Sequence, residues 1–415
     1  MSAEPVTARL TDWRRIALAV GPGLVVMLAD TDAGSVITAS QSGAAYGYRL
    51  VLPQLLAIPL LYATQELTIR LGIGTGLGFA ALLQRRFGKG VARVALALLV
   101  VSCFGALVTQ LGALGGLAES FGLPAPAAVA AAVAFFIAVV TLGAYQSVER
   151  VAILFGLAEL AFLIVAWRAG PDAHQMARQM REAPFGDAGY LYLLAANIGT
   201  TFMPWGAFYQ QSAIIDKGVE RRDLSGSRWE TLGGAALCQI VTAAMVIAAA
   251  ATVGHGAGGA RFDTVGDIAG AFSDVLGPAL GRGLFAIGLI GSALVAAMVV
   301  SLTVAWAAGE TMGVNHSLEH RPREAPGFYA AFVALMVSAG LFVAVGIDPL
   351  RLSVAVGVVN ALMLPLVLAG LYVLARLELR GGPLALRGGY AWTLALLFAG
   401  LGAAALYSGL AGAIG

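Results

Sequence analysis

Two acidic residues interrupt the first apolar segment of the chain. Asp30 and Asp32 lie in the run Gly21-Pro-Gly-Leu-Val-Val-Met-Leu-Ala-Asp-Thr-Asp-Ala-Gly-Ser35, which is otherwise apolar enough to enter a bilayer. A charged side chain at the centre of a membrane helix costs at least about 2.5–3.5 kcal/mol. Two of them beside Gly34, which loosens a helix, therefore need a compensating partner. A bound cation is the simplest such partner.

The composition places the whole chain in a membrane. Of its 415 residues 59% are hydrophobic and 12% are charged, 54 are glycines, and the mean hydropathy is +0.84. A soluble protein could not bury so much apolar surface, whereas a bilayer requires it and tolerates glycine-rich helices. The net charge of +2 suggests neither a nucleic-acid partner nor an obligate protein partner. Cys103 and Cys238 lack the spacing of a disulfide framework or a zinc site, and we interpret both as packing residues.

The apolar segments predict an all-α integral membrane protein with eleven membrane-spanning helices. Each segment is about 20 residues or longer, which is the length that crosses a bilayer. The predicted spans are 16–46 (broken), 50–71, 92–120, 125–144, 148–168, 188–213 (broken), 230–254, 283–308, 327–346, 350–376 and 390–413.

Loop charges predict the orientation of the chain in the plasma membrane. The polar stretch 1–15 has no cleavage pattern of a signal peptide, so we expect a cytoplasmic N-terminus. Cytoplasmic loops carry an excess of lysine and arginine, and the even-numbered loops do so here. The weakest point is the external loop 169–187, which also contains Arg178 and Arg181.

Spans 1 and 6 share an interruption by small or helix-breaking residues. In span 6 the interruption is Gly199-Thr-Thr-Phe-Met-Pro-Trp-Gly206, where Pro204 lacks a backbone donor and disfavours helix at Met203. Two broken helices five spans apart are typical of a transporter built from inverted repeats, with its site at the breaks. We predict one transmembrane domain over 1–415, with repeat one at about 16–168, repeat two at about 188–376, and an extra helix at 390–413.

The first break supplies hard oxygen ligands. Asp30, Thr31, Asp32 and Ser35 place four side-chain oxygens in one short stretch, together with carbonyls such as that of Ala29. Carboxylate-rich oxygen sites suit Mg²⁺, Ca²⁺ or Mn²⁺. In the alternative interpretation, one of the acids caps a half-helix or faces a water-filled vestibule.

The second break adds four weaker candidates. Met203 either offers a thioether, which favours Mn²⁺ or Fe²⁺, or fills a packing gap. Trp205 and Gly206 either line the cavity or pack. Thr200, with its neighbour Thr201, either contacts the ion or satisfies freed backbone groups.

Other intramembrane ionisable residues are few. Glu66 precedes Arg70 by four residues and predicts an i,i+4 ion pair. Glu159 stands alone in span 5, and the sequence does not reveal its partner. The four histidines, His174, His255, His316 and His320, all fall in predicted loops, so proton coupling would have to use carboxylates.

Taken together, these motifs resemble the Nramp divalent-metal transporters, which have a LeuT-like fold. Gly21-Pro-Gly followed by Asp32-Ala-Gly-Ser35 resembles the family's helix-1 motif Asp-Pro-Gly-Asn. The stretches 41–50 and 65–72 resemble its helix 1b to helix 2 region. Gly199-Thr-Thr-Phe-Met-Pro204 resembles the helix-6 motif that ends in Met-Pro-His.

The chain also departs from the family's pattern. Ser35 stands where the metal-binding asparagine is expected, Ala33 replaces proline, and Asp30 is an additional acid. Trp205 replaces the helix-6 histidine, and helix 3 has Ala106, Thr109 and Gln110 where the family carries acids implicated in proton passage. This combination resembles the divergent Nramp-related branch that carries Mg²⁺ without proton coupling and with some of the ion's water retained.

We therefore predict a transporter, not an enzyme, that takes up Mg²⁺ and Mn²⁺ by alternating access and needs no cofactor. The metal ion and the lipid bilayer are its expected partners, and the metal-site candidates are Asp30, Thr31, Asp32, Ser35, Thr200, Met203, Trp205 and Gly206. Alternatives are a proton-coupled Mn²⁺/Fe²⁺ Nramp transporter, a sodium-coupled organic-solute transporter on the same fold, and an intramembrane enzyme or receptor. The sequence shows no catalytic arrangement within a span to favour the last.

Overall fold

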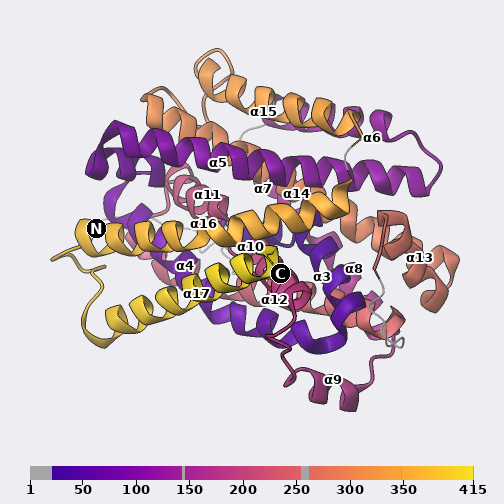
Figure 1. The fold of residues 1–415 in the computed structure, drawn as a ribbon. Helices are drawn as coiled ribbons and strands as arrows, with labels where there is room; N and C mark the ends of the chain where they lie inside the picture. The colour runs from indigo at the N-terminus through magenta and orange to yellow at the C-terminus, as the bar shows by residue number, and fades with distance from the viewer. Residues whose placement is uncertain (1–20, 143–144, 254–260, 347, 415) are drawn as a thin grey trace, which may run out of the picture.

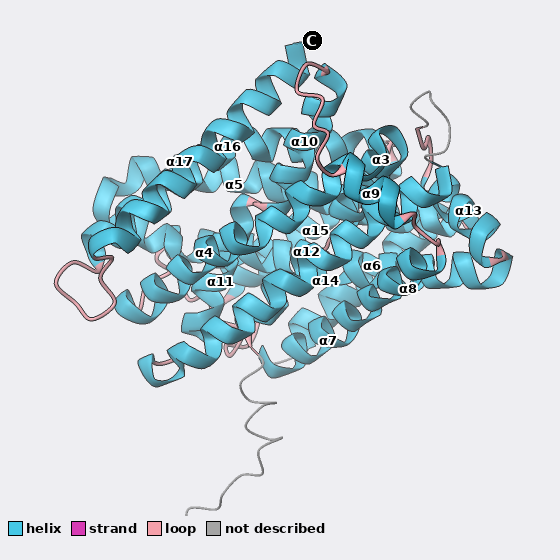
Figure 2. Ribbon diagram, turned by 90° about the horizontal axis from the view of Figure 1, so that it is seen from below, coloured by secondary structure: helices cyan, strands magenta, loops and turns pink. Residues whose placement is uncertain are grey.

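The computed structural model describes residues 21–142, 145–253, 261–346 and 348–414. The predicted cytoplasmic leader, the first five residues of span 16–46, residues 143–144 of span 4, residue 254 of span 7, and His255 lie outside the described residues. Within these ranges the regular elements are all helical (Figure 2). Nine helical stretches of the described chain are long and apolar enough to cross a membrane. The all-α membrane fold is confirmed.

The first five predicted spans correspond to helices with two departures from regularity. Span 1 is broken into two helices, as predicted, and span 5 contains a 3₁₀ turn that was not predicted. The elements are α2 (Pro22–Asp30), α3 (Ala33–Tyr46), η1 (Gly47–Leu50), α4 (Val51–Thr75), α5 (Phe79–Ser120, kinked at Gly88), α6 (Ala125–Leu142), α7 (Tyr145–Leu157), η2 (Ala158–Leu160) and α8 (Ala161–Arg168).

The remaining six spans include the second predicted break. Two short helices, α9 and α13, were not predicted; α13 begins with a capping box in which Thr264 and Asp267 bond each other's backbone amides. The elements are α9 (Ala173–Gln179), α10 (Ala188–Thr201), α11 (Pro204–Asp216), η3 (Arg221–Asp223), α12 (Leu224–Val253), α13 (Val265–Leu276), α14 (Pro278–Met312), α15 (Pro326–Ala344), α16 (Pro349–Glu378) and α17 (Gly388–Ile414).

The broken helices lie inside the bundle. Helices α2 and α3 pack against α12 and α14, while α10 packs between α3 and α16. The long helix α5 runs across the molecule, with α6 and α15 on its outer side (Figure 1). Helix α17 packs on α10 and α16 at the periphery, as the extra helix was expected to do. This arrangement surrounds both breaks with protein, as a non-helical backbone at membrane depth requires. The division into two repeats stays a prediction.

Glycines allow the central helices to approach closely. A Cβ added at Gly199 of α10 would lie 2.7 Å from the backbone nitrogen of Ala361 in α16 and would overlap the carbonyl of Gly357. Membrane helices commonly use small residues in this way, since lipid provides no hydrophobic force to press them together. Gly199 therefore fixes the distance between the second break and α16.

One end of the bundle is closed by hydrogen bonds and an ion pair. At the end where α2 begins, which we call the Gly21 end, the Glu230 carboxylate on α12 accepts the backbone N–H of Gly21 at 2.5 Å and that of Leu24 at 2.8 Å. Lys217 donates to Glu149 at 2.7 Å and ties α11 to α7. These bonds hold the start of α2 in place.

The predicted ion pair between Glu66 and Arg70 is confirmed, with Arg70 Nε 2.6 Å from Glu66 Oε1. Arg228 of α12 donates to the same oxygen at 2.6 Å, and the hydroxyl of Tyr390 donates to Glu66 Oε2 at 3.2 Å. One buried carboxylate thus joins α4, α12 and α17 near the Gly21 end.

We predict that Gly199→Ala lowers the melting temperature of the detergent-solubilised protein, because the added methyl group must displace α16 at a cost of about 1–3 kcal/mol. Gly233→Ala is the matched control, since a Cβ at Gly233 of α12 meets no atom within 4 Å. Thermal unfolding of both variants checks this; equal melting temperatures would show that α10 and α16 are not tightly packed.

Candidate cation-binding site

The first break leaves two buried carboxylates between half-helices. Helix α2 ends at Asp30 and α3 begins at Ala33, with Asp32 in an extended conformation (φ −74°, ψ 170°). The exposed fractions are 5% for Asp30 and 2% for Asp32. Neither acid is in a salt bridge with any described residue. Their charge is therefore not balanced by the protein's own cations.

Asp32 is held firmly by hydrogen bonds. Its Oδ1 accepts the backbone N–H of Ser35 at 2.6 Å and the Ser35 hydroxyl at 2.8 Å, so Asp32 is the N-cap of α3. Its Oδ2 accepts Nε2 of Gln110 at 2.6 Å, and Oε1 of Gln110 accepts the N–H of Ala33 at 2.8 Å. The helix-capping interpretation is thus confirmed for Asp32. A capping carboxylate also gains from the positive end of the helix dipole.

Asp30 has far weaker partners. Its carboxylate Oδ2 lies 3.6 Å from the thiol of Cys238 on α12, which donates a weak hydrogen bond. Its backbone carbonyl oxygen lies 2.9 Å from the Ser35 hydroxyl, whose single hydrogen is shared between this oxygen and Oδ1 of Asp32. Most of the hydrogen-bonding capacity of this carboxylate is thus unused by the described protein groups. Cys238, interpreted from sequence as a packing residue, instead contacts a candidate ligand.

The second break lies directly beside the first. Helix α10 ends at Thr201 and α11 begins at Pro204, whose missing N–H is harmless at a helix start. The Ser35 hydroxyl is 3.3 Å from the carbonyl oxygen of Thr200, which joins the two breaks. The Thr200 hydroxyl itself donates to the Asn197 carbonyl at 3.2 Å, so the backbone oxygen of Thr200, not its side chain, faces the first break.

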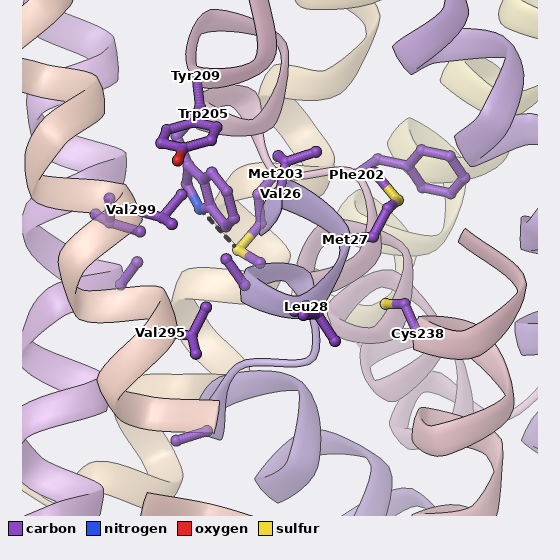
Figure 3. Close-up of a cluster of buried hydrophobic side chains, with 14 of the residues drawn as sticks. Val26, Met27, Leu28, Phe202, Met203, Trp205, Tyr209, Cys238, Val295 and Val299 are labelled. Carbon is purple, nitrogen blue, oxygen red and sulfur yellow. Dashed lines mark hydrogen bonds between the residues drawn. The ribbon is translucent and has the colours of Figure 1, made fainter. Parts of the chain in front are cut away.

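The remaining candidates at the second break are packing against α2 and α4. Figure 3 shows Met203, Trp205 and Val26 in one buried apolar cluster. The sulfur of Met203 accepts the indole N–H of Trp205 at 3.1 Å. A Cβ added at Gly206 would lie 2.9 Å from Nε2 of Gln65. In this structure the packing interpretation of Met203 and Trp205 is therefore favoured, while direct binding by these residues stays a prediction.

Polar residues that the sequence analysis did not select hold the half-helices in position. Asn197 of α10 donates to the Ser42 hydroxyl at 2.7 Å and accepts Nε2 of Gln54 at 2.6 Å. On the other side, the Ser353 hydroxyl of α16 donates to the carbonyl of Gly34 at 2.9 Å. Buried amides and hydroxyls within apolar spans were the available signal. Their partners are non-local and could not be read from the sequence.

The donor chemistry of the site suits a hard cation. No three histidine, cysteine, aspartate or glutamate side chains converge on one point within the described ranges. Carboxylates, hydroxyls and the free carbonyls at the ends of α2 and α10 are the groups that the breaks present. Oxygen donors of this kind suit hard divalent cations.

A cavity opens at the opposite end from Gly21, which we call the Tyr46 end. It has a volume of about 1060 Å³ and is lined by residues of α3, α10 and α16, among them Tyr46, Leu193 and Val354. Leu193 is one helical turn from Asn197. Asp187 lies at its mouth, where the amide of Tyr190 and the hydroxyl of Tyr46 lower the pKa of this carboxyl. The cavity therefore ends within about one helical turn of the residues that hold α3 in position, while the bonds of Glu230 close the Gly21 end.

Comparisons with known proteins agree with this geometry. The family model described as "Natural resistance-associated macrophage protein-like", or Nramp, matches residues 23–411. The divalent metal cation transporter MntH of Verminephrobacter eiseniae is 31% identical over 370 residues, which are 85% of this chain and 79% of that protein. The MntH of Acidiphilium cryptum is 30% identical over 93% of this chain and 89% of its own.

Solved structures show the same fold. A manganese transporter of Eremococcus coleocola, crystallised with an aromatic bis-isothiourea compound, superposes with a TM-score of 0.74 at 18% identity, covering 100% of this chain and 90% of that one. A nucleobase-cation-symport-1 family transporter gives a TM-score of 0.62 at 14% identity, covering 95% and 90%. The fold is the LeuT-like one that was predicted. With its family model matched over nearly the whole length, the chain belongs to the Nramp family.

Proposed function

We propose that this protein transports divalent cations, Mg²⁺ and Mn²⁺, across the plasma membrane by alternating access. The observation that carries the proposal is the pair of buried acids, Asp30 and Asp32, at a helix break without a basic partner in the described structure. A doubly positive ion is the guest that matches two carboxylates. The names of the relatives, which are divalent metal cation transporters, support the same class of substrate.

The ion binds between the two breaks in this proposal. Asp32 is the principal charge, Asp30 is a second acid that acts directly or through water, and Thr31, Ser35 and the Thr200 carbonyl contact the ion or its bound water. Since the Met203 sulfur is engaged by Trp205, the site is dominated by oxygen and does not discriminate strongly between Mg²⁺ and Mn²⁺. This favours the resemblance to the Mg²⁺-carrying branch of the family.

The orientation follows from the loop charges. We place the Gly21 end in the cytoplasm and the Tyr46 end outside, so that the cavity at Tyr46 admits the ion. The membrane potential then drives uptake with about 2.3 kcal/mol per charge per 100 mV, roughly twice that for a divalent ion. Transport requires opening of the bonds that Glu230 makes to α2.

Asp32→Asn is expected to abolish high-affinity binding of Mg²⁺ and Mn²⁺, because it removes the charge that the hydrogen bonds of Ser35 and Gln110 stabilise. Calorimetric titration of the purified protein is the measurement. Asp274→Asn, which removes an exposed charge from α13, is the control and should bind like the unmodified protein. Unchanged binding by the Asp32 variant would remove this residue from the site.

Met203→Leu should leave the ratio of Mn²⁺ to Mg²⁺ affinities unchanged within about threefold, since leucine preserves the apolar volume and the sulfur is not a ligand. The two dissociation constants are measured by the same titration. A loss of Mn²⁺ binding of about tenfold or more, with Mg²⁺ binding intact, would make the thioether a metal ligand and return the protein to the ordinary Mn²⁺/Fe²⁺ group.

Metal uptake should not acidify the lumen of proteoliposomes that contain a pH-sensitive dye. The expectation rests on Gln110 of α5, which lies beside Asp32. Its amide cannot release a proton, and it belongs to the helix in which the family pattern has acids. Uptake of Mn²⁺ measured in parallel confirms that the vesicles are active. Acidification that depends on both metal and protein supports the proton-coupled alternative.

A further inference from the structure

Span 5 contains one buried acid that the proposed site has not used. Glu159 is 2% exposed and lies in the 3₁₀ turn η2, between α7 and α8. A short 3₁₀ turn in the middle of a long helix often marks a functional position. Its partner could not be read from the sequence.

The structure places Glu159 against the first break. Its carboxyl faces the side chain of Thr31 and is close enough to Asp30 and Asp32 to interact electrostatically with both. Close helix packing sets this position. A Cβ at Gly156 of α7 would lie 2.5 Å from Cδ1 of Leu28 in α2, and one at Gly291 of α14 would lie 2.8 Å from the Cβ of Ala158.

Two polar atoms in this contact lack partners. Thr31 Oγ1 and Glu159 Oε1 are buried, and neither has a hydrogen bond of regular geometry to any described group. The contact between the two side chains is therefore looser than a regular bond. Buried polar atoms are almost always paired, so these two oxygens are available to a hydrogen-bonding guest.

The spacing determines what kind of occupant fits. Asp30, Cys238 and Glu159 neighbour one another, but within the described chain they do not converge as direct ligands of one metal ion. A cation with its water shell is wider than a bare one, and its waters are hydrogen-bond donors. Both unpaired oxygens can accept such bonds.

We propose that Glu159 and Thr31 form hydrogen bonds to the water shell of the transported cation. Together with Asp30 they make the outer-sphere part of the binding site, while Asp32 remains its principal charge. The proposal rests on the proposed function and extends it, because it makes span 5 part of the binding site. Glu159 favours hydrated Mg²⁺ over ions that shed water readily. The Glu159 carboxyl acts as an acceptor of hydrogen bonds from bound water.

Hexaamminecobalt(III) is the probe, since it resembles hydrated Mg²⁺ in size and does not exchange its ligands. We expect it to bind the unmodified protein and to compete with Mg²⁺ in calorimetric titrations. Glu159→Gln should weaken the binding of the probe and of Mg²⁺ by about tenfold or more, as changes outside the direct metal ligands typically do. The affinity for Mn²⁺ should fall by a smaller factor. Thr31→Val should shift the same two affinities in the same direction.

Glu119→Gln is the matched control, because Glu119 of α5 is exposed and remote from the break; its affinities should equal those of the unmodified protein. Melting temperatures of all variants report folding, and Thr31→Val provides the test if Glu159→Gln does not fold. The proposal is overturned if the probe does not bind while Mg²⁺ does, or if both variants keep their affinities for probe and Mg²⁺. If the unmodified protein binds neither Mg²⁺ nor Mn²⁺, the proposed function itself fails.

Discussion

The structure depends on how it accommodates negative charge inside the membrane. Asp32 is stabilised by the amide of Ser35, the side chain of Gln110 and the start of α3, which together offset the cost of burying this carboxylate. Asp30 has only a thiol as partner. Asp32 is therefore structural as well as available, whereas most of the hydrogen-bonding capacity of Asp30 is left unused by the described protein groups.

The same break determines which parts of the molecule can move. Helix α3 is tied to α5 through Gln110, to α10 through Asn197 and to α16 through Ser353. Helix α2 is held chiefly by Glu230 and by packing against α7, α12 and α14. The unwound residues Thr31 and Asp32 separate the two halves, so α2 and α3 are held by different sets of contacts. Opening of the Gly21 end in the proposed cycle requires that the Glu230 bonds break and that α2 shifts against the helices on which it packs.

The sequence predicted the spans well because the bilayer imposes a simple rule of length and polarity. Both breaks were visible, since acids or a proline within an apolar segment contradict that rule. The 3₁₀ turn at Glu159 and the helices α9 and α13 were not predicted. Nothing in the residues around Glu159 breaks a helix, and the turn arises where α7 and α8 pack on their neighbours.

At the site, the orientation of the side chains was harder to predict from the sequence than the positions of the breaks. Asp32 and Ser35 could be placed because their bond is local, three residues apart. Gln110, Cys238 and Glu159 come from helices far away in the sequence, and only the packed bundle brings them to Asp30 and Asp32. For Met203 the sequence motif left both a ligand and a packing role open, and in the structure its sulfur accepts the indole N–H of the neighbouring Trp205. Which groups meet depends on helix rotation, and helix rotation is determined by the packing of the whole bundle.

The most direct test of the account is anomalous diffraction from crystals of the protein grown with Mn²⁺. The account predicts a single strong anomalous peak at the break between α2 and α3, beside the carboxylates of Asp30 and Asp32, that disappears when excess Mg²⁺ is added. A peak at another place, with both carboxylates still buried and unoccupied at the same Mn²⁺ concentration, would contradict it.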